Sequence, residues 1–396
     1  MRIIVTGLIA QYPLPGVTWD YLQFVLGLRN LGHDVYYIED TGQWPYNPQE
    51  GGISKGCCYN VGYLAGVMNR FSLSDRWAYR FPWQSEWYGL PKSRRTEVFN
   101  TADMLINVSG TLANFEDYRQ IPYLVYIDSD PVFTQVKLAR GQEDFRRYVD
   151  AHNRLFSFGE TLPGNAPDTG HKWRPTRQPI VLSEWEATVQ QGKAYTTVMN
   201  WTSYNDVKHS GIVYGQKDVE FRRFLELPSL VAPVHLEIAV NQGKNRQAPL
   251  SLLKHKGWQM VDPENSLTDI NSYRAYIGSS RGEWSVAKNG YVRGQAGWFS
   301  CRSACYLAAS RPVILQETGF SNVLPVGLGL LSFTTLDEAV SAIEAVESDY
   351  ELHCNAAREI AEEYFDSRKV LTRLLDDGFS STAPGPSNDA RTTRIL

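Results

Sequence analysis

Residues 2–39 have the sequence RIIVTGLIAQYPLPGVTWDYLQFVLGLRNLGHDVYYIE, and this stretch predicts how the chain folds. It begins with a short β-branched run, passes through a Gly- and Pro-containing loop at residues 7–16, and then places apolar residues at helical spacing over residues 19–29. Gly32 stands where a helix-ending glycine belongs, and residues 34–39 form a second apolar run. A strand, a helix and a strand in this order predict a βαβ unit with parallel strands.

The same alternation continues along the chain in two series. Apolar runs near residues 104 and 123 extend the first series, and a stretch rich in Gly, Pro and turn formers at residues 161–185 ends it. A second series starts near residue 194 and includes an apolar run at residues 273–280 that we expect to be a strand. Two series in tandem predict an α/β chain with two Rossmann-like, doubly wound domains that face a cleft.

The length of 396 residues also fits two domains, at a prior of roughly 100 to 200 residues each. We expect a first domain at residues 1–180, a second at residues 190–350, and helices at residues 351–377 that could pack back on the first domain. Residues 378–396 are polar and rich in Pro, Gly and Ser, which predicts a disordered tail.

Composition limits the classes of partner. Hydrophobic residues make up 43% of the chain and charged residues 21%, which is typical of a packed globular protein. The formal net charge of -4 leaves no excess of cations for a phosphate backbone, so we expect no nucleic-acid partner. Five cysteines do not predict a disulfide framework, and the adjacent Cys57 and Cys58 lack zinc-ligand spacing. We therefore predict no metal site.

The chain starts MRIIVTGLIA, which is a strand-like run rather than a basic leader followed by a cleavage site. We therefore expect a cytoplasmic protein. No apolar run approaches the roughly 18 to 20 residues of a membrane-spanning helix, so we expect no membrane span. Composition does not indicate an oligomeric state.

Residues 279–320 hold the groups that a diphosphate requires. Such a ligand needs backbone N–H donors at the start of a helix, hydroxyl groups and one or two cations. The phrase GWFSCRS enters a predicted helix and supplies the first of these. The hydroxyls and cations are Lys288, Ser300, Arg302 and Ser303. Thr202 and Lys217 could meet the diphosphate from the opposite side, or could be a helix cap and a surface lysine.

Carboxylates end two strands of the first series. Asp128 and Asp130 follow one strand, and Glu160 follows the next. Strand carboxyl ends face the crevice of an open α/β sheet, so these side chains could touch a substrate. The two aspartates could equally form a structural ion pair with Lys137, and their spacing alone is weak support for a metal. His152 is a further candidate base, although a single histidine more often has a structural role.

The first loop and the first helix carry a family pattern. The loop GLIAQYPLPG has prolines where a dinucleotide-binding loop has glycines, which counts against a nicotinamide cofactor. The helix that follows ends in LGHDV at residues 31–35. In both features the sequence resembles the N-terminal domain of the GT-B glycosyltransferases, in which this loop faces the cleft. The resemblance is one of pattern and order, and it covers roughly residues 1–375.

The C-terminal half carries the more specific phrases of the same family. Gly297, Trp298 and Ser300 match a GW-x-S phrase that enters a helix. Residues 310–313 resemble the G-x-P-V phrase, with Ser in place of Gly, and residues 316–319 end the strand that touches the sugar. The phrases occur in the order that the family has, which strengthens the resemblance.

The resemblance implies a glycosyltransferase that moves a sugar from a nucleotide-diphosphate donor, such as a UDP sugar, to a hydroxyl or amine of a small-molecule or glycan acceptor. The second domain would hold the donor and the first domain the acceptor, with no metal and no cofactor besides the nucleotide sugar. The implied donor contacts are Gly297, Trp298, Ser300, Glu317, Thr318 and Gly319. The implied acceptor contacts are Gly16, Trp19, Asp128 and Asp130.

The catalytic base of inverting members often stands near the start of the first helix. Asp20 occupies that place here and is the leading candidate, with Glu160 and His152 as further candidates. Asp20 could instead cap the helix by accepting backbone N–H bonds.

One departure from the family concerns the anomeric outcome. Many retaining relatives carry a ribose-binding glutamate seven residues before the Pro of the second phrase, and this chain has Cys305 there. Retaining chemistry is therefore in doubt, and inversion is expected. Glu283 could bind the ribose instead, or could be a solvated surface acid.

Two other functions suit the same fold. A sugar-nucleotide 2-epimerase has the same donor cleft but no acceptor pocket, and a non-catalytic protein could bind the nucleotide sugar without turnover. The aromatic segment at residues 44–87 favours a separate acceptor, and so favours the transferase.

Overall fold

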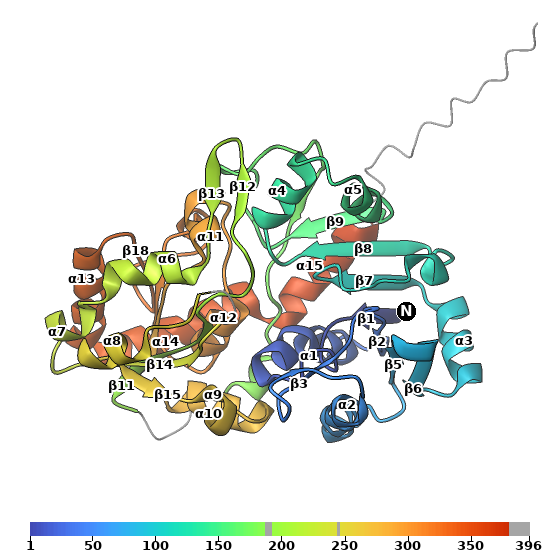
Figure 1. Ribbon diagram of the computed structural model, residues 1–396, viewed down its shortest axis with the longest axis horizontal. Coiled ribbons are helices and arrows are strands. Elements are labelled where there is room, and N and C mark those ends of the chain that lie inside the picture. Colours follow the sequence, from blue (N-terminus) through green and yellow to red (C-terminus); the bar gives the residue numbers. More distant parts are fainter. Residues whose placement is uncertain (187–191, 244–245, 380–396) are drawn as a thin grey trace, which may run out of the picture.

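The computed structural model describes residues 1–186, 192–243 and 246–379. From residue 380 onward, the tail that we expected to be disordered lies outside the described residues. Two large, mostly parallel sheets dominate the described part of the chain, each with helices on both faces (Figure 1). We call each sheet with its covering helices a lobe. The predicted α/β architecture of two Rossmann-like domains is confirmed.

The N-terminal lobe is built on a sheet that has eight strands within the described residues. In order across the sheet the strands are β10 (Arg174–Pro175), β9 (Arg154–Ser157), β8 (Tyr123–Asp128), β7 (Met104–Val108), β1 (Arg2–Thr6), β2 (Asp34–Glu39), β5 (Trp77–Phe81) and β6 (Glu86–Gly89). Only the pairing of β5 with β6 is antiparallel. The order reverses between β1 and β7, so this is the topological switch point where the carboxyl ends of the strands open a crevice.

The helices of this lobe follow from the same sequence patterns. They are α1 (Pro15–Asn30), α2 (Cys58–Arg70), α3 (Lys92–Thr101), α4 (Phe133–Ala139) and α5 (Glu143–Asp150), with 3-10 turns at Trp83–Ser85 and Phe115–Tyr118. Helix α1 begins four residues earlier than its apolar spacing predicts, because Pro15 has the fixed φ that suits a first helical position. A small hairpin, β3 (Tyr46–Asn47) with β4 (Gly52–Ile53), lies between β2 and α2.

The C-terminal lobe is built on a parallel sheet with six strands among the described residues. In order they are β15 (Gln259–Val261), β14 (His235–Asn241), β11 (Ala194–Asn200), β16 (Gly282–Ser285), β17 (Val313–Gln316) and β18 (Leu330–Phe333). Its helices are α6 (Lys217–Phe221), α7 (Leu227–Leu230), α8 (Leu250–His255), α9 (Pro263–Ser266), α10 (Ile270–Ser279), α11 (Asn289–Gly294), α12 (Cys301–Ala308) and α13 (Leu336–Ser348), with a 3-10 turn at Arg222–Phe224. The antiparallel hairpin β12 (Val207–His209) with β13 (Ile212–Tyr214) stands between β11 and α6.

The prediction of a strand at residues 273–280 is wrong, because residues 273–279 belong to helix α10. Asp269 caps the helix, because its carboxylate accepts the N–H groups of Asn271 and Ser272. In return, the Ser272 hydroxyl oxygen accepts the backbone N–H of Asp269. This capping box starts a helix immediately before the apolar run. The apolar residues of the run, Tyr273 and Ile277, then fall on one buried face of that helix.

The last helix returns to the N-terminal lobe, whereas α14 (Tyr350–Ile360) packs on the C-terminal lobe. After α14 and a π-helical turn at Ala361–Phe365, helix α15 (Ser367–Phe379) lies against α1 (Figure 1). A Cβ at Gly27 of α1 would come within 2.5 Å of Leu371 and 2.9 Å of Ser367, so the lack of a side chain there allows the close approach.

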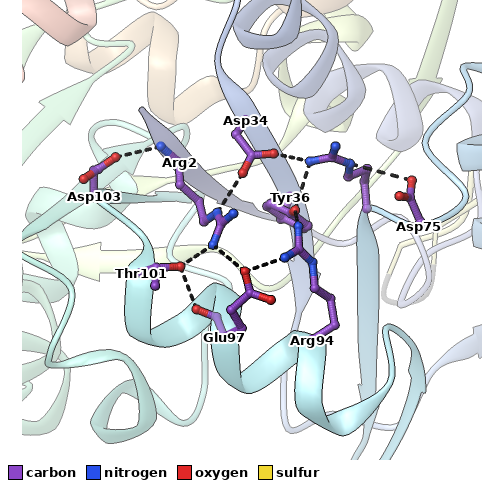
Figure 2. Close-up of polar contacts among 9 residues, drawn as sticks. Arg2, Asp34, Tyr36, Asp75, Arg94, Glu97, Thr101 and Asp103 are labelled. Atoms are coloured by element: carbon purple, nitrogen blue, oxygen red, sulfur yellow. Dashed lines mark hydrogen bonds and ion pairs between the residues drawn. The ribbon is translucent and has the colours of Figure 1, made fainter.

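The amino ends of the first strands are fixed on the side of the sheet away from the crevice. Figure 2 shows Arg2, Asp34, Tyr36, Arg94 and Glu97 in one polar network. Arg2 pairs with Asp34 at 2.7 Å, and Arg94 donates to the Tyr36 hydroxyl at 2.5 Å. The network joins β1, β2 and α3 at the amino ends of the strands. The cleft lies at the carboxyl ends of the same strands. None of the helices in the described part of the chain is both long and apolar enough to cross a membrane.

Candidate active site between the lobes

A cavity of about 130 Å³ lies where the two lobes meet. It is lined by Asp20, Val108, Ser109, Ser129, Gln178, Trp298, Ser300 and Cys301. The lining comes from α1, from the carboxyl ends of β7 and β8 and from the start of α12, so both lobes contribute. Two of the cavity residues from the N-terminal lobe share a hydrogen bond, in which the Ser129 hydroxyl donates to the Ser109 hydroxyl at 2.6 Å.

Asp20 faces the C-terminal lobe from α1. Its carboxyl group lies beside the thiol of Cys301, and burial raises its pKa to about 6, against the lowering effect of that thiol and of the charge of Arg302. The alternative that Asp20 caps α1 is wrong, since the cap position is Leu14 and the helix begins at Pro15. Asp20 is therefore a carboxylate of the cavity wall, with a pKa in the range that suits a general base.

The phrase GW-x-S and the end of β17 form one turn in the C-terminal lobe. Gly297 and Gly319 have φ of +81° and +94°, a region that favours glycine, and the Gly297 N–H donates to the Thr318 carbonyl at 2.9 Å. The Thr318 hydroxyl donates to the carbonyl of Trp298 at 2.5 Å. Glu317 accepts the N–H groups of Thr318 and Gly319, so its carboxylate is directed at its own turn.

The start of α12 presents Ser300 and a buried hydroxyl to this region. Ser300 occupies the cap position, makes no capping hydrogen bond through its side chain, and lines the cavity. Ser303 is fully buried, and its hydroxyl has no hydrogen-bond partner among the described residues. The helix N-terminus therefore offers the Ser300 hydroxyl and a positive dipole end at the cavity, as a bound anion requires.

Arg302 has a different position from the one that we expected. Its guanidinium pairs with Glu283 at 2.5 Å and donates to the Val198 carbonyl at 2.8 Å and to Ser285 at 2.9 Å. Glu283 has no exposed surface, so it is not the surface acid of one interpretation, and it is closed to a ribose in this conformation. Arg302 thus supports the first turn of α12 from within the lobe, because each of its three nitrogens already donates to a partner in that lobe.

Lys288 and Asp130 meet across the two lobes. The ammonium of Lys288 lies 3.0 Å from Asp130 and 2.9 Å from the Tyr204 hydroxyl. Tyr204 donates to the same carboxylate at 2.5 Å, and Tyr291 of α11 also donates to it. Burial would raise the pKa of Asp130, but the charge of Lys288 and these hydrogen bonds outweigh it and hold the pKa below its usual value. An N-terminal carboxylate is thus bound by three C-terminal side chains.

Among the described residues, Lys217 is a cation of this region that has no ion-pair partner. It begins α6, is buried, and has no hydrogen bond or ion pair to any described residue. Burial lowers its pKa well below the usual value, as does the charge of Arg302, against the attraction of Glu283. An anionic ligand would reverse this shift. Thr202 lies near the end of β11, where its hydroxyl donates to the Arg246 carbonyl at 3.3 Å.

Three predicted acceptor or base residues have structural partners instead. Trp19 is buried between the lobes, with its ring 5.0 Å from that of Trp185. Asp128 is buried and accepts hydrogen bonds from four groups, including Thr134 and Ser157. His152 lies among aromatic rings with its ring nitrogens 2.9 Å from Asn107 and 3.0 Å from a backbone carbonyl, and burial lowers its pKa to about 4.

Gly16 and Glu160 lie at other contacts between segments. A Cβ at Gly16 would be 3.5 Å from the ring of Tyr273, an ordinary contact with helix α10 of the other lobe. Glu160 pairs with Arg177. Neither residue lines the cavity that contains Asp20.

Gln178, Ser109 and Ser129 line the cavity although the sequence did not single them out. The side-chain oxygen of Gln178 is buried and has no hydrogen-bond partner among the described residues, so it is an acceptor available to a hydroxyl. Ser109 and Ser129 each follow a buried strand, and this position was the signal that could have identified them. Gln178 lies in a turn-rich segment with no such signal.

The described residues contain no group of three or more His, Cys, Asp or Glu side chains placed to hold a metal ion. The Asp-Ser-Asp sequence at 128–130 therefore lacks a third protein ligand there.

No family model and no curated protein matches the sequence. Comparison with solved structures finds an alpha-glucosyltransferase in complex with UDP and a 13-mer DNA, 13% identical, which covers 96% of this chain and 100% of its own at a TM-score of 0.60. Sucrose-phosphate synthase from Thermosynechococcus elongatus is 11% identical, with coverage of 95% and 98% and a TM-score of 0.56. Anabaena HepE in complex with UDP is 9% identical, with coverage of 95% and 99% and a TM-score of 0.57.

Two Rossmann-like lobes that face a shared cleft define the GT-B fold. The solved structures above share this architecture over nearly the full chain. At identities of 9 to 13% the likeness shows the fold, and the GT-B fold suggested by the sequence phrases is confirmed.

Our exclusion of nucleic acid as a partner is overturned by the same comparison. Several of the similar structures are alpha-glucosyltransferase complexes with DNA, at TM-scores of 0.57 to 0.60. The exclusion used the net charge of the whole chain, and such a sum says nothing of a local basic surface.

We predict that Asp130→Asn weakens the contact between the lobes. The amide keeps the shape of the side chain but removes the charge that Lys288 needs, so the free energy of unfolding should fall by about 1 to 3 kcal/mol in urea titrations. Asp144→Asn is the matched control, because its partner Arg147 is exposed, and it should change stability by less than about 0.5 kcal/mol. Equal effects of the two substitutions would show that the pair across the lobes contributes nothing.

Proposed function

We propose that this protein is an inverting, metal-independent glycosyltransferase that moves a sugar from a nucleotide-diphosphate donor to an acceptor hydroxyl or amine. One observation carries the proposal: Asp20 of the N-terminal lobe stands in one cavity with Ser300 at the start of α12 in the C-terminal lobe. A base and a helix N-terminus that face each other across a cleft supply the two ends of a displacement reaction.

The donor diphosphate would bind at the start of α12. The helix dipole, the hydroxyl of Ser300 and the ammonium groups of Lys217 and Lys288 favour negative charge there. These groups would also stabilise the charge that develops as the nucleoside diphosphate leaves. Similar structures contain UDP, which makes UDP the first nucleotide to test.

The acceptor would react in a single displacement. Its hydroxyl proton passes to the carboxylate of Asp20 while its oxygen forms a bond to the anomeric carbon of the sugar. The bond from that carbon to the phosphate oxygen breaks, and its electron pair leaves with the nucleoside diphosphate. One displacement from the opposite face inverts the anomeric carbon, and the anomeric proton coupling of the product tests this directly.

The lobes must separate for the donor to enter. The cavity of about 130 Å³ is smaller than the roughly 300 to 1,000 Å³ that ligand sites usually offer. The contact between Asp130 and Lys288 is one of those that would have to change, and a phosphate oxygen could replace the carboxylate on Lys288.

A separate acceptor surface favours the transferase over an epimerase or a non-catalytic binding protein. Trp83 is 58% exposed and lies 5.8 Å, between ring centroids, from Trp44 in the aromatic segment of the N-terminal lobe. An exposed ring such as that of Trp83 suits the apolar face of a sugar or a base. The acceptor panel should contain small alcohols, oligosaccharides and duplex DNA, since similar transferases occur in complexes with DNA. Donor binding without turnover on any of them would support the non-catalytic alternative.

We predict that Lys217→Ala weakens nucleoside diphosphate binding by about tenfold or more, because a charge-assisted hydrogen bond to phosphate contributes roughly 1.5 to 3 kcal/mol. Calorimetric titration of UDP, GDP and dTDP measures the effect. Lys254→Ala is the matched control, since this lysine is exposed on α8, and it should leave the affinity unchanged. Unchanged nucleotide affinity in Lys217→Ala would contradict the assignment of Lys217 to the donor diphosphate site.

We predict that turnover depends on Asp20. A general base must be deprotonated, so the rate should rise as the pH increases through the pKa of Asp20, at about 6, and then level off. Asp20→Asn should lower turnover by about 100-fold or more with donor affinity within twofold of wild type. A chelator should leave the wild-type rate intact. A flat pH profile, or equal losses of turnover and donor affinity in Asp20→Asn, would contradict the assignment.

A further inference from the structure

Glu39 ends strand β2 beside the loop that joins β1 to α1. In dinucleotide-binding Rossmann domains the N–H groups of this loop hold a phosphate, and an acidic residue near the end of the second strand binds a ribose. The N-terminal lobe here has the same sheet order around β1, so its loop is placed where a nucleotide could bind. The N–H groups of this loop therefore need hydrogen-bond acceptors.

The loop donates its N–H groups to a carboxylate of its own chain. Glu39 accepts the N–H of Ala10 at 2.8 Å on one oxygen and the N–H of Gln11 at 2.5 Å on the other. The Tyr37 hydroxyl donates to Glu39 at 2.6 Å and accepts the N–H of Ile9 at 3.0 Å. Three successive loop amides thus converge on one anion and its hydroxyl neighbour, as they would on a phosphate.

The surroundings leave no room for a second anion. Glu39 has no exposed surface. A Cβ at Gly7 would lie 2.5 Å from the ring of Tyr21 and 2.8 Å from the Tyr37 hydroxyl, so aromatic side chains fill the space next to the loop. On its other side the Ala10 carbonyl accepts a hydrogen bond from Asn60 at 2.7 Å.

We propose that Glu39 is an internal substitute for a phosphate. It occupies the anion site of the loop between β1 and α1, keeps nucleotides out of the N-terminal lobe, and fixes the entry to α1. Because α1 carries Asp20 five residues after its first residue, Glu39 is also a positioning residue for the base. This second part rests on the proposed transferase function, whereas the first part does not.

Exogenous anions test the first part without any nucleotide. Glu39→Ala leaves a carboxylate-sized space lined by amide donors, so acetate should raise its melting temperature by several degrees while neutral acetamide does not. The experiment is run at pH 8, where carboxylates in this site are charged, because burial raises the pKa of Glu39 to about 7. Wild type and Glu39→Gln, in which the site is filled, should respond equally little to both additives. An acetate response that is the same in all three proteins, or absent in Glu39→Ala, would overturn the proposal.

Amide exchange provides a second measurement if Glu39→Ala does not fold. In Glu39→Gln one loop N–H faces an amide nitrogen in place of a carboxylate oxygen, so exchange at residues 9–11 should quicken at least tenfold while exchange in β7 stays unchanged. Exchange in the loop that stays at the wild-type rate would contradict the proposal.

Kinetics of Glu39→Gln test the positioning role. Turnover should fall at least tenfold while UDP binding stays within twofold of wild type, because the donor groups belong to the other lobe. A parallel loss of both would indicate general destabilisation and overturn the positioning role. Failure of UDP to bind wild type as well would count against the proposed transferase, and the acetate result would still decide whether Glu39 substitutes for a phosphate.

Discussion

The buried pair between Arg302 and Glu283 holds the first turn of helix α12 against strand β16. Arg302 joins three parts of the C-terminal lobe, since it binds Glu283 and Ser285 of β16 and the Val198 carbonyl of β11 from the first turn of α12. Removal of one partner from such a pair leaves an uncompensated buried charge and typically costs about 3 to 5 kcal/mol. The helix start therefore has little freedom, and Ser300 is held toward the N-terminal lobe.

The two lobes satisfy similar anion-binding loops in opposite ways. In the N-terminal lobe the loop amides are taken by Glu39, whereas in the C-terminal lobe Ser300 makes no capping hydrogen bond through its side chain and Lys217 has no partner among the described residues. A site whose donors are unused is ready for a ligand, and one whose donors are bound to a buried carboxylate is not. Under the proposed function, this difference predicts one nucleotide-sugar site in the chain rather than two.

Local patterns in the sequence predicted the parts of the fold that depend on periodicity and end signals. The βαβ unit of residues 2–39, the helix at GWFSCRS and the cleft position of Asp20 are of this kind, because strand ends and helix starts are local features. Residues 273–280 were assigned wrongly because apolar spacing in a short run suits a strand as well as a helix, and the cap at Asp269 decides between them.

Partners distant in sequence could not be predicted. The sequence predicts Arg302 and Lys288 as cations that bind phosphate. In the structure Arg302 pairs with Glu283, and Lys288 pairs with Asp130 of the other lobe. Gln178 enters the cavity from a turn-rich segment that has no periodicity at all. Such contacts depend on how separate elements pack within a lobe or between the lobes, and the local pattern of a single sequence does not predict that packing.

A crystal structure of the protein with UDP bound tests the central claim most directly. The account predicts the diphosphate at the start of α12, within hydrogen-bond distance of Ser300 and Lys217, with Asp20 across the cleft and the loop at residues 9–11 still bound to Glu39. A diphosphate bound by that N-terminal loop, with Glu39 displaced, would contradict it.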